Sequence, residues 1–464
     1  MSFLEHAIQV YHALLDDEQA RATQALLDEG QRREGLFFGT RPLTTVLRPH
    51  FIMGAHVALL EQACRTVAVA SRMVIEYAMQ EPELWRRLAF TPGEQALMEI
   101  DPGYAEWSVS SRLDSFLDGE TGSLQFIEYN AESPAAIAYG DVLSELFLDM
   151  PLMRDFARQY RVRPLPARAR LQHALLQAYQ AWGGTGDPHI AIVDWKGLPT
   201  HSEFVLFQRY FAEHGLDSVI CAPEDLRYEG GTLHLDGRPV DLIYKRVLTA
   251  EFLQRLGDRA LDHPIVQAYR DHKVCIANNF RAKLLHKKSI FALLSDDSIT
   301  EAAGVDVEQR ALLRRHVPWT RFVEPGSTTY DGRDVDLLPF VLAERDRLVL
   351  KPNDEYGGKG ISIGWETDAE TWAAAVRAAC EDPFVVQERV HIAYEEYPAW
   401  HDDHLEIERR LVDTDPFLFG TDVQGCLTRL SSVTLLNVTA GGGSTVPTFV
   451  IDEPDETMDH TPAG

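Results

Sequence analysis

Lysine is the residue that this chain most conspicuously lacks. None occurs in the first 195 positions, and only eight of the 44 lysine and arginine residues are lysine. Six of the eight lie between Lys273 and Lys359. Genomic base composition and chance are one explanation for the position of any single lysine. The ammonium group is, however, a compact point charge that is common beside phosphates, so residues 273–359 are the first place to look for an anion site.

Positive charge is scarce overall. The chain has 71 acidic against 44 basic residues, a net charge of −27 and a sequence pI near 5.0. A general nucleic-acid-coating role needs a basic face, so we expect no nucleic acid partner. A local basic pocket for a nucleotide remains compatible with this balance.

Long apolar runs, a basic N-terminal segment and paired cysteines are also missing. No stretch reaches the 18 or more apolar residues of a membrane helix, and the first residues do not resemble a signal peptide. The five cysteines lie far apart without a Cys-x-x-Cys pattern, which argues against a structural zinc site. We therefore expect a cytoplasmic protein with no membrane partner.

A β-hairpin is predicted over residues 108–130. Apolar and polar residues alternate from Ser108 to Leu117 and again from Ser123 to Asn130, with Asp118-Gly119 as the turn. Before it, residues 1–95 have mostly helical spacing, including 55–79, and a helix is expected over 168–182.

Polar residues on this hairpin form the first candidate site. Arg112 and Asp114 are two apart on one strand, and Glu128 and Asn130 are two apart on the next, so each pair shares a face. Two carboxylates and an amide are hard oxygen donors of the kind that Mg²⁺ requires. The alternative is a solvated polar face of a sheet. This alternative is disfavoured by three apolar residues that are expected on the opposite face, Leu113, Phe116 and Ile127.

A strand–helix–strand unit follows the break at Gly183-Gly184-Thr185-Gly186. Residues 190–194 form a short apolar strand, 202–214 an amphipathic helix, and the segment around Val219 a second strand. We expect these strands to be parallel neighbours in a small α/β domain. From residue 276 a helical stretch is expected to run to Leu294.

The glycine-rich segment Lys351-Pro-Asn-Asp-Glu-Tyr-Gly-Gly-Lys-Gly360 is the second candidate site. A strand is expected on each side of it, so it matches neither a Walker A loop nor a dinucleotide fingerprint. Glycines allow backbone N–H groups to approach phosphate oxygens, and lysine neutralises phosphate charge. A plain flexible hairpin is the alternative. A helix over about 368–381, capped at Thr367-x-x-Glu370, and a strand ending in Gln387-Glu388-Arg389-Val390 follow.

These motifs together resemble a known family. Arg112-x-Asp114 followed by Phe126-Ile-Glu-Tyr-Asn-Ala-Glu-Ser-Pro134 is similar to the metal-binding segment of the circularly permuted ATP-grasp proteins that resemble glutathionylspermidine synthase. The order, with metal-bearing strands before the nucleotide lysines, is the same. The resemblance covers about 100–450.

The resemblance implies a mixed α/β (α+β) fold, a circularly permuted ATP-grasp with a small inserted Rossmann-like α/β domain and a helical N-terminal region. The predicted parts are a helical region (1–100), metal-bearing strands (101–185), the inserted domain (186–275), the nucleotide subdomain with closing core strands (276–450) and an acidic tail (451–464), expected to be disordered.

Carried over residue by residue, the resemblance implies ATP and Mg²⁺ as cofactors. It assigns Mg²⁺ to Asp114, Glu128 and Asn130, transition-state stabilisation to Arg112 and the acid substrate to Ser133. The positions it implies for ATP are Lys288, Lys351, Gly357, Gly358, Lys359, Gln387, Glu388, Arg389, Val390 and Arg429. Lys283 or Lys287 could replace Lys288.

The implied activity is ligation of a small carboxylate to an amine through an acyl phosphate, the partners being an amino acid, peptide or polyamine. The chain departs from the bifunctional synthetases, because no thiol amidase domain precedes residue 100 and the spermidine- and glutathione-selecting positions are not recognisable. Two alternatives stay open: an ATP-binding regulatory protein without catalysis, and a phosphotransferase on the same fold.

Overall fold

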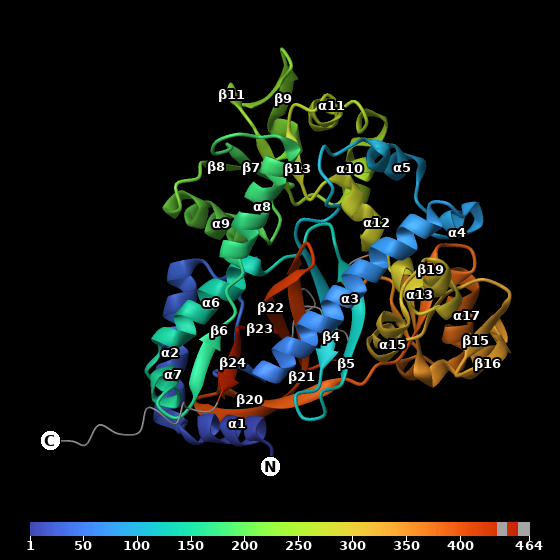
Figure 1. The fold of residues 1–464 in the computed structure, drawn as a ribbon. Helices are drawn as coiled ribbons and strands as arrows, with labels where there is room; N and C mark the ends of the chain where they lie inside the picture. The colour runs from blue at the N-terminus through green and yellow to red at the C-terminus, as the bar shows by residue number, and fades with distance from the viewer. Residues whose placement is uncertain (356, 434–442, 453–464) are drawn as a thin grey trace.

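The computed structural model describes residues 1–355, 357–433 and 443–452. Figure 1 shows three groups of strands: a large central sheet, a parallel sheet at the top, and a smaller antiparallel sheet at the right. The acidic tail predicted from 451 onward lies outside the described residues, except for its first two positions. The domain limits given above stay a prediction.

The central sheet has the strand order β23-β22-β21-β4-β5, with β20 paired to β21, and all its pairs are antiparallel. It joins the predicted hairpin to strands from the far end of the chain, since Arg112 pairs with Phe417. Its strands are β4 (Ser111–Leu117), β5 (Leu124–Asn130), β20 (Ala393–His401), β21 (His404–Phe419), β22 (Asp422–Ser431) and β23 (Ser444–Val446).

Several helices from the first half of the chain, among them α2, α3, α6 and α8, contact this sheet. The long helix α3 buries Leu60, Val67 and Val74, which recur on one side of the helix, and it crosses the sheet in Figure 1. No helix within the described ranges has the length and apolarity of a membrane span. The helices are α1 (Phe3–Ala13), α2 (Asp17–Glu34), α3 (Gly54–Ala78), α4 (Pro82–Arg87), α5 (Pro92–Glu99), α6 (Ile137–Asp149), α7 (Pro151–Phe156) and α8 (Arg168–Trp182). Short strands beside them are β1 (Phe37–Phe38), β2 (Arg41–Pro42), β3 (His50–Met53), β6 (Arg161–Pro164) and β24 (Thr448–Asp452).

The inserted sheet is parallel throughout, in the order β13-β12-β7-β8. Val219 pairs with Ala191, which confirms that the two predicted strands are parallel neighbours. All residues of β7 are buried, as expected for a parallel strand covered on both faces. The elements of this region are β7 (Ile190–Val193), α9 (His201–Glu213), β8 (Ser218–Cys221), β9 (Leu226–Glu229), β10 (Thr232–Leu235), β11 (Arg238–Pro239), β12 (Leu242–Lys245), α10 (Thr249–Leu256), α11 (Pro264–Arg270) and β13 (Cys275–Ala277).

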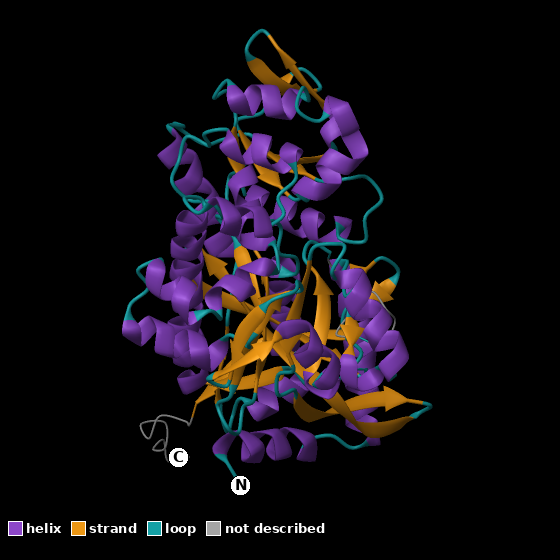
Figure 2. Ribbon diagram, turned by 90° about the vertical axis from the view of Figure 1, so that its right-hand side faces the viewer, coloured by secondary structure: helices purple, strands orange, loops and turns teal. Residues whose placement is uncertain are grey.

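A second antiparallel sheet has the order β14-β19-β17-β18, so the glycine loop joins two antiparallel strands as predicted. The buried Trp372 of α17 packs beneath it with Leu348 and Val386. The elements here are α12 (Lys283–His286), α13 (Ser289–Leu294), α14 (Asp297–Ala302), α15 (Val307–His316), β14 (Thr320–Phe322), β15 (Ser327–Tyr330), β16 (Arg333–Asp336), α16 (Leu337–Ala343), β17 (Leu348–Pro352), β18 (Ser362–Ile363), α17 (Ala369–Ala379) and β19 (Phe384–Glu388). Figure 2 shows helices flanking the central strands from the side, with strand hairpins extending beyond the helices at the top and at the lower right.

Two local predictions are wrong. The helical stretch expected from 276 begins later, because Cys275–Ala277 pair with β12 as a strand, and a short apolar run is ambiguous between helix and strand. The cap of α17 is Asp368, not Thr367, since the Asp368 carboxylate accepts bonds from Glu370 N and Thr371 N. Both residues are good caps, and only the backbone conformation decides between them.

Candidate active site

One cavity of about 600 Å³ lies between the three sheets, a size typical of small-ligand sites. It gathers residues from both predicted sites, which are more than two hundred positions apart in the chain. The predicted site residues that line it are Arg112, Asp114, Glu128, Asn130, Ser133, Lys288, Lys351, Gly357, Gly358, Gln387, Glu388, Arg389, Val390 and Arg429.

The β4–β5 hairpin supplies one wall. Asp114 pairs directly with Glu128, and Arg112 pairs with Asn130. The expectation for Phe116 and Ile127 is wrong, because both line the cavity instead of the opposite face. Phe116 lies two residues after Asp114 on β4, so the two side chains point to the same face. Ile127 is the extra residue of a β-bulge in β5, which changes the face that it occupies.

Asp114 is held by two arginines. Arg112 donates from Nε (2.7 Å) and from its terminal nitrogen (3.1 Å), and Arg429 donates at 2.8 Å. The amide of Asn130 donates a further bond of 2.9 Å. Burial alone would raise the pKa of Asp114, but the two guanidinium groups outweigh it and lower the pKa to about 2.

Arg429 is anchored by two aspartates that the sequence analysis missed. Its guanidinium lies 2.5 Å from Asp413 and 2.9 Å from Asp415, both on β21 and both fully buried. Burial raises the pKa of Asp415 well above its usual range. Two acids inside the apolar run Leu411-Val-Asp-Thr-Asp-Pro-Phe-Leu are a readable signal, because buried carboxylates need charged partners.

Glu128 pairs with Lys288 across the cavity wall. Lys288 Nζ lies 2.7 Å from Glu128 Oε1 and also donates to the carbonyl of Glu355. Burial would raise the pKa of Glu128, but the lysine lowers it below its usual value. Lys288 therefore connects the hairpin to the start of the glycine loop.

Lys351 is buried at the end of β17. Its ammonium donates to the carbonyl of Ile127 at 3.2 Å and to Gln387 Oε1 at 2.6 Å. Gln387 in turn donates to Thr320. Burial lowers the pKa of Lys351 to about 8. The Gln387 side chain thus orients Lys351, in a segment (387–390) for which the resemblance implies contacts with ATP.

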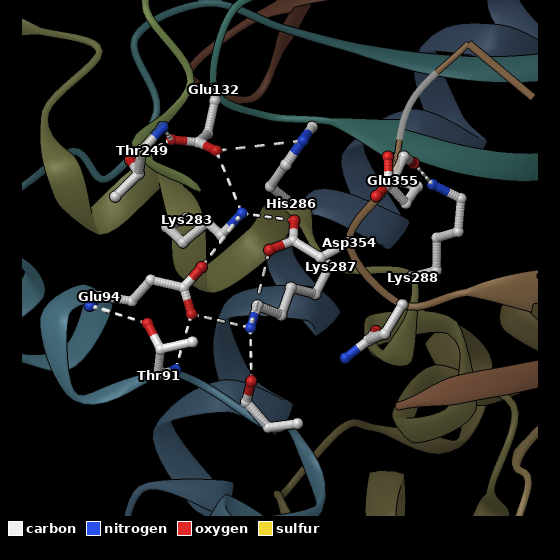
Figure 3. Close-up of polar contacts among 12 residues, drawn as sticks. Thr91, Glu94, Glu132, Thr249, Lys283, His286, Lys287, Lys288, Asp354 and Glu355 are labelled. Carbon is white, nitrogen blue, oxygen red and sulfur yellow. Dashed lines mark hydrogen bonds and ion pairs between the residues drawn. The ribbon is translucent and has the colours of Figure 1, made fainter. Parts of the chain in front are cut away.

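The other two candidate lysines lie in a buried ion network beside the cavity, drawn in Figure 3. Lys283 contacts Glu94, Glu132 and Asp354, and Lys287 contacts Glu94. Neither lines the cavity, and both side chains are less than 5% exposed. The geometry therefore favours Lys288 among the three alternatives. Through Asp354, the network also fixes the first turn of the glycine loop.

The glycine loop closes part of the cavity with Gly357 and Gly358, whose φ angles are 67° and 77°. Side chains rarely adopt this conformation. Lys359 does not line the cavity. Its side chain is 76% exposed and pairs with Glu355 at 3.2 Å, since it points outward from the turn.

An apolar slot lies next to the segment 387–390. Arg389 stacks 4.2 Å from the ring of Trp365, and Ile363 and Ile392 line the same region. A flat apolar slot with a stacked cation suits a planar aromatic group. Trp365 was missed because it follows the glycine loop without a motif of its own.

The opposite end of the cavity reaches the inserted sheet. Ser133, predicted to contact the acid substrate, lines it, and so do Asp194 and Arg246, which directly follow β7 and β12. The sequence analysis passed over both residues. For Asp194, its position at the end of a predicted parallel strand was the available signal, since ligands bind at the carboxyl ends of such strands.

The donor set fits Mg²⁺ in part. Asp114, Glu128 and Asn130 offer two carboxylates and an amide oxygen. In the described part of the chain no three His, Cys, Asp or Glu side chains form a metal-binding group, so the amide is needed. Both carboxylates already have cationic partners, which offset the repulsion between them. These residues suit an ion that arrives with phosphate ligands better than one bound alone.

Comparison with known proteins gives three findings. Residues 114–387, more than half of the chain, match a family described as a circularly permuted ATPgrasp. "Putative glutamate--cysteine ligase 2-2" of Frankia casuarinae is 28% identical over 70% of this chain and 37% of that protein. "Putative glutamate--cysteine ligase 2-3" of Frankia alni is 28% identical over 84% of this chain and 44% of that protein. The chain thus spans less than half the length of these curated relatives.

A solved structure has a similar fold. It is a glutathione synthetase-like effector from Globodera pallida in its apo form, with a TM-score of 0.57 and 12% sequence identity, covering 93% of this chain and 96% of that one.

Proposed function

The chain belongs to the circularly permuted ATP-grasp family, and on this premise we propose that it is an ADP-forming, ATP-dependent carbon–nitrogen ligase that joins a carboxylate to an amine. The observation that carries the proposal is the convergence of the two predicted sites. Lys288 contacts Glu128 and Lys351 contacts the carbonyl of Ile127, so the phosphate-binding lysines and the carboxylates act on the same part of the cavity.

The reaction has two steps. A substrate carboxylate oxygen bonds to the γ-phosphorus of ATP, the bond from that phosphorus to the β–γ bridging oxygen breaks, and ADP leaves. The amine nitrogen then bonds to the acyl carbon of the acyl phosphate, loses a proton to solvent, and inorganic phosphate leaves. No protein nucleophile is required.

The residues have separate tasks. Lys351 and Lys288 neutralise phosphate charge, and Arg112 stabilises the negative charge that develops on the transferring group. Mg²⁺ held by Asp114, Glu128 and Asn130 would spread that charge further. The adenine would stack in the slot beside Trp365.

The surroundings of the site keep these groups in place. Asp413 and Asp415 hold Arg429, which holds Asp114, and Gln387 holds Lys351. The glycine loop excludes water, which would otherwise hydrolyse the acyl phosphate.

The substrates are proposed as small amino acids or peptides. The names of the two Frankia relatives make glutamate and cysteine the first acid and amine to test. A polyamine, implied by the likeness to glutathionylspermidine synthase, is the second amine to test.

The test is phosphate release from ATP with purified protein, Mg²⁺, and pairs of acids and amines. A ligase releases phosphate only when acid and amine are both present, and with hydroxylamine as the amine it yields a hydroxamate from the acyl phosphate. Glu128→Gln should abolish both signals, and Lys359→Ala, outside the cavity, should leave them unchanged. Nucleotide binding without phosphate release would favour the regulatory alternative, and phosphate transfer without an amine would favour the phosphotransferase.

A further inference from the structure

Two side chains of opposite charge face the cavity from neighbouring strands of the inserted sheet. Asp194 directly follows β7, and Arg246 directly follows β12. Lys245 pairs with Val193, and Arg246 N donates to Val193 O at 2.9 Å. The backbones of the two charged residues are therefore adjacent.

The gap between β7 and β12 is the topological switch point of the inserted sheet, where the strand order reverses. From β7 the chain continues through α9 to β8 on one side, and from β12 it continues through α10 and α11 to β13 on the other. The two connections leave in opposite directions, which opens a crevice between the carboxyl ends of β7 and β12. Open α/β sheets bind ligands in this crevice.

The Arg246 side chain is held in place by its contacts, but one of its hydrogen-bond donors has no partner among the described residues. It is 5% exposed, donates to Pro134 O at 2.6 Å and to the Tyr244 hydroxyl at 3.1 Å, and packs on the ring of Phe204. Its Nε is buried without a hydrogen-bond partner among the described residues. A buried guanidinium with a free donor on a cavity wall suits a carboxylate ligand.

Asp194 supplies the negative charge beside the positive charge of Arg246. One of its carboxylate oxygens accepts from Trp195 N at 2.8 Å. Within the described ranges, no lysine, arginine or histidine forms an ion pair with it. Arg246 is near enough to influence its charge but is not bonded to it. A half-buried carboxylate in a cavity without a bonded cation suits an ammonium ligand.

We propose that Asp194 and Arg246 bind the α-ammonium and the α-carboxylate of an amino-acid substrate, a site that deepens and rests on the ligase function proposed above. A polyamine fits less well, because Arg246 would repel it. An uncharged substrate would leave the Asp194 carboxylate without a bonded cation.

The arrangement also indicates which end of that substrate reacts. An ammonium held by a carboxylate has no lone pair with which to attack, so the molecule reacts elsewhere. Arg246 donates to Pro134 O and Arg112 donates to the next carbonyl, Ala135 O. A carboxylate at the far end of the substrate would lie toward Arg112, so the inferred acid substrate is an amino acid or peptide with a second, distal carboxylate.

The experiment measures binding by titration calorimetry in the presence of Mg²⁺ and a non-hydrolysable ATP analogue. The probes are L-glutamate, glutarate, which lacks the amino group, and 4-aminobutyrate, which lacks the α-carboxylate. L-Aspartate, succinate and β-alanine form a second, shorter set. In at least one set the amino acid should bind about 10- to 100-fold more tightly than either matched compound, the scale of a hydrogen bond between charged groups.

Asp194→Asn keeps the acceptor for Trp195 N and tests the residue directly. It should remove the advantage of the amino acid over the diacid and leave the affinity for the diacid unchanged. Asp217→Asn, which removes an exposed ion pair with Arg238 directly before β8, should change nothing.

Equal binding of glutamate and glutarate, equal weakening of all probes by Asp194→Asn, or no binding of any probe while the ATP analogue binds would overturn the inference. Failure of the ATP analogue itself to bind would instead contradict the proposed function.

Discussion

Lys288 Nζ lies 2.7 Å from Glu128 Oε1, although 160 positions separate the two residues in the chain. The ion pair joins the N-terminal end of α13 to β5 and forms part of the cavity wall. It links a proposed phosphate ligand to a proposed metal ligand, so a nucleotide that enters must exchange this contact for its own charges.

Lys351→Met is expected to weaken ATP binding by about 1.5–3 kcal/mol, or about 10- to 150-fold in Kd, because a charged hydrogen-bond donor is lost from a buried position. Methionine keeps the apolar stem, so the fold should persist. A fluorescent-nucleotide titration measures the effect. Lys359→Ala is the matched control, since its side chain is 76% exposed outside the cavity; equal affinities of the two variants would contradict the role given to Lys351.

Mg²⁺ is expected to bind measurably only together with nucleotide. Arg112, Arg429 and Lys288 already compensate Asp114 and Glu128, so the free carboxylates attract a cation weakly. Calorimetric titration of Mg²⁺ should show no saturable binding without ATP and clear binding with a non-hydrolysable analogue. Glu128→Gln should abolish the second signal. Tight binding of Mg²⁺ to the free protein would refute this expectation.

Arg429→Met is expected to destabilise the protein by about 3–5 kcal/mol, because it leaves Asp114, Asp413 and Asp415 buried with less compensation. Denaturant unfolding followed by tryptophan fluorescence measures the loss. Arg158→Met removes an exposed ion pair with Asp155 and should cost less than about 1 kcal/mol. Similar losses in both variants would show that the aspartate cluster tolerates an unpaired charge.

Asp194→Asn is expected to stabilise the free protein at neutral pH. Burial raises the pKa of Asp194 from 3.8 to about 6, and Glu251 adds to this while Arg246 and Lys245 oppose it. Below about pH 3 the carboxyl is protonated in both folded and unfolded states and contributes no difference. Between pH 3.8 and about 6 the unfolded state loses this proton while the buried carboxyl keeps it, so stability falls with rising pH. The full cost, about 1–3 kcal/mol, is present above pH 6.

The melting temperature of Asp194→Asn should therefore exceed that of the wild type at pH 8, and the two should converge at about pH 3. Asp217→Asn serves as control, because its ion pair with Arg238 lowers the pKa of Asp217; this variant should be no more stable than the wild type at pH 8. A difference for Asp194→Asn that is independent of pH would mean that its carboxylate is already compensated in the fold.

Local patterns in the sequence determined much of the architecture. The assignment to the circularly permuted ATP-grasp fold is confirmed, and so are the hairpin of β4 and β5 and the parallel pair β7 and β8. These features depend on residues close together in the chain, since alternation of apolar residues decides which side of a strand is buried. The roles given to individual site residues stay predictions.

Only the tertiary structure decided among residues that look alike in the sequence. Lys287 and Lys288 are adjacent, yet Glu94 binds the first inside the molecule and Glu128 binds the second at the cavity. Likewise Arg246 and Asp194 acquire their place only when two strands far apart in the chain lie side by side. The physical reason is that a buried charge is stable only beside a partner, and partners distant in the chain are selected by packing rather than by local sequence.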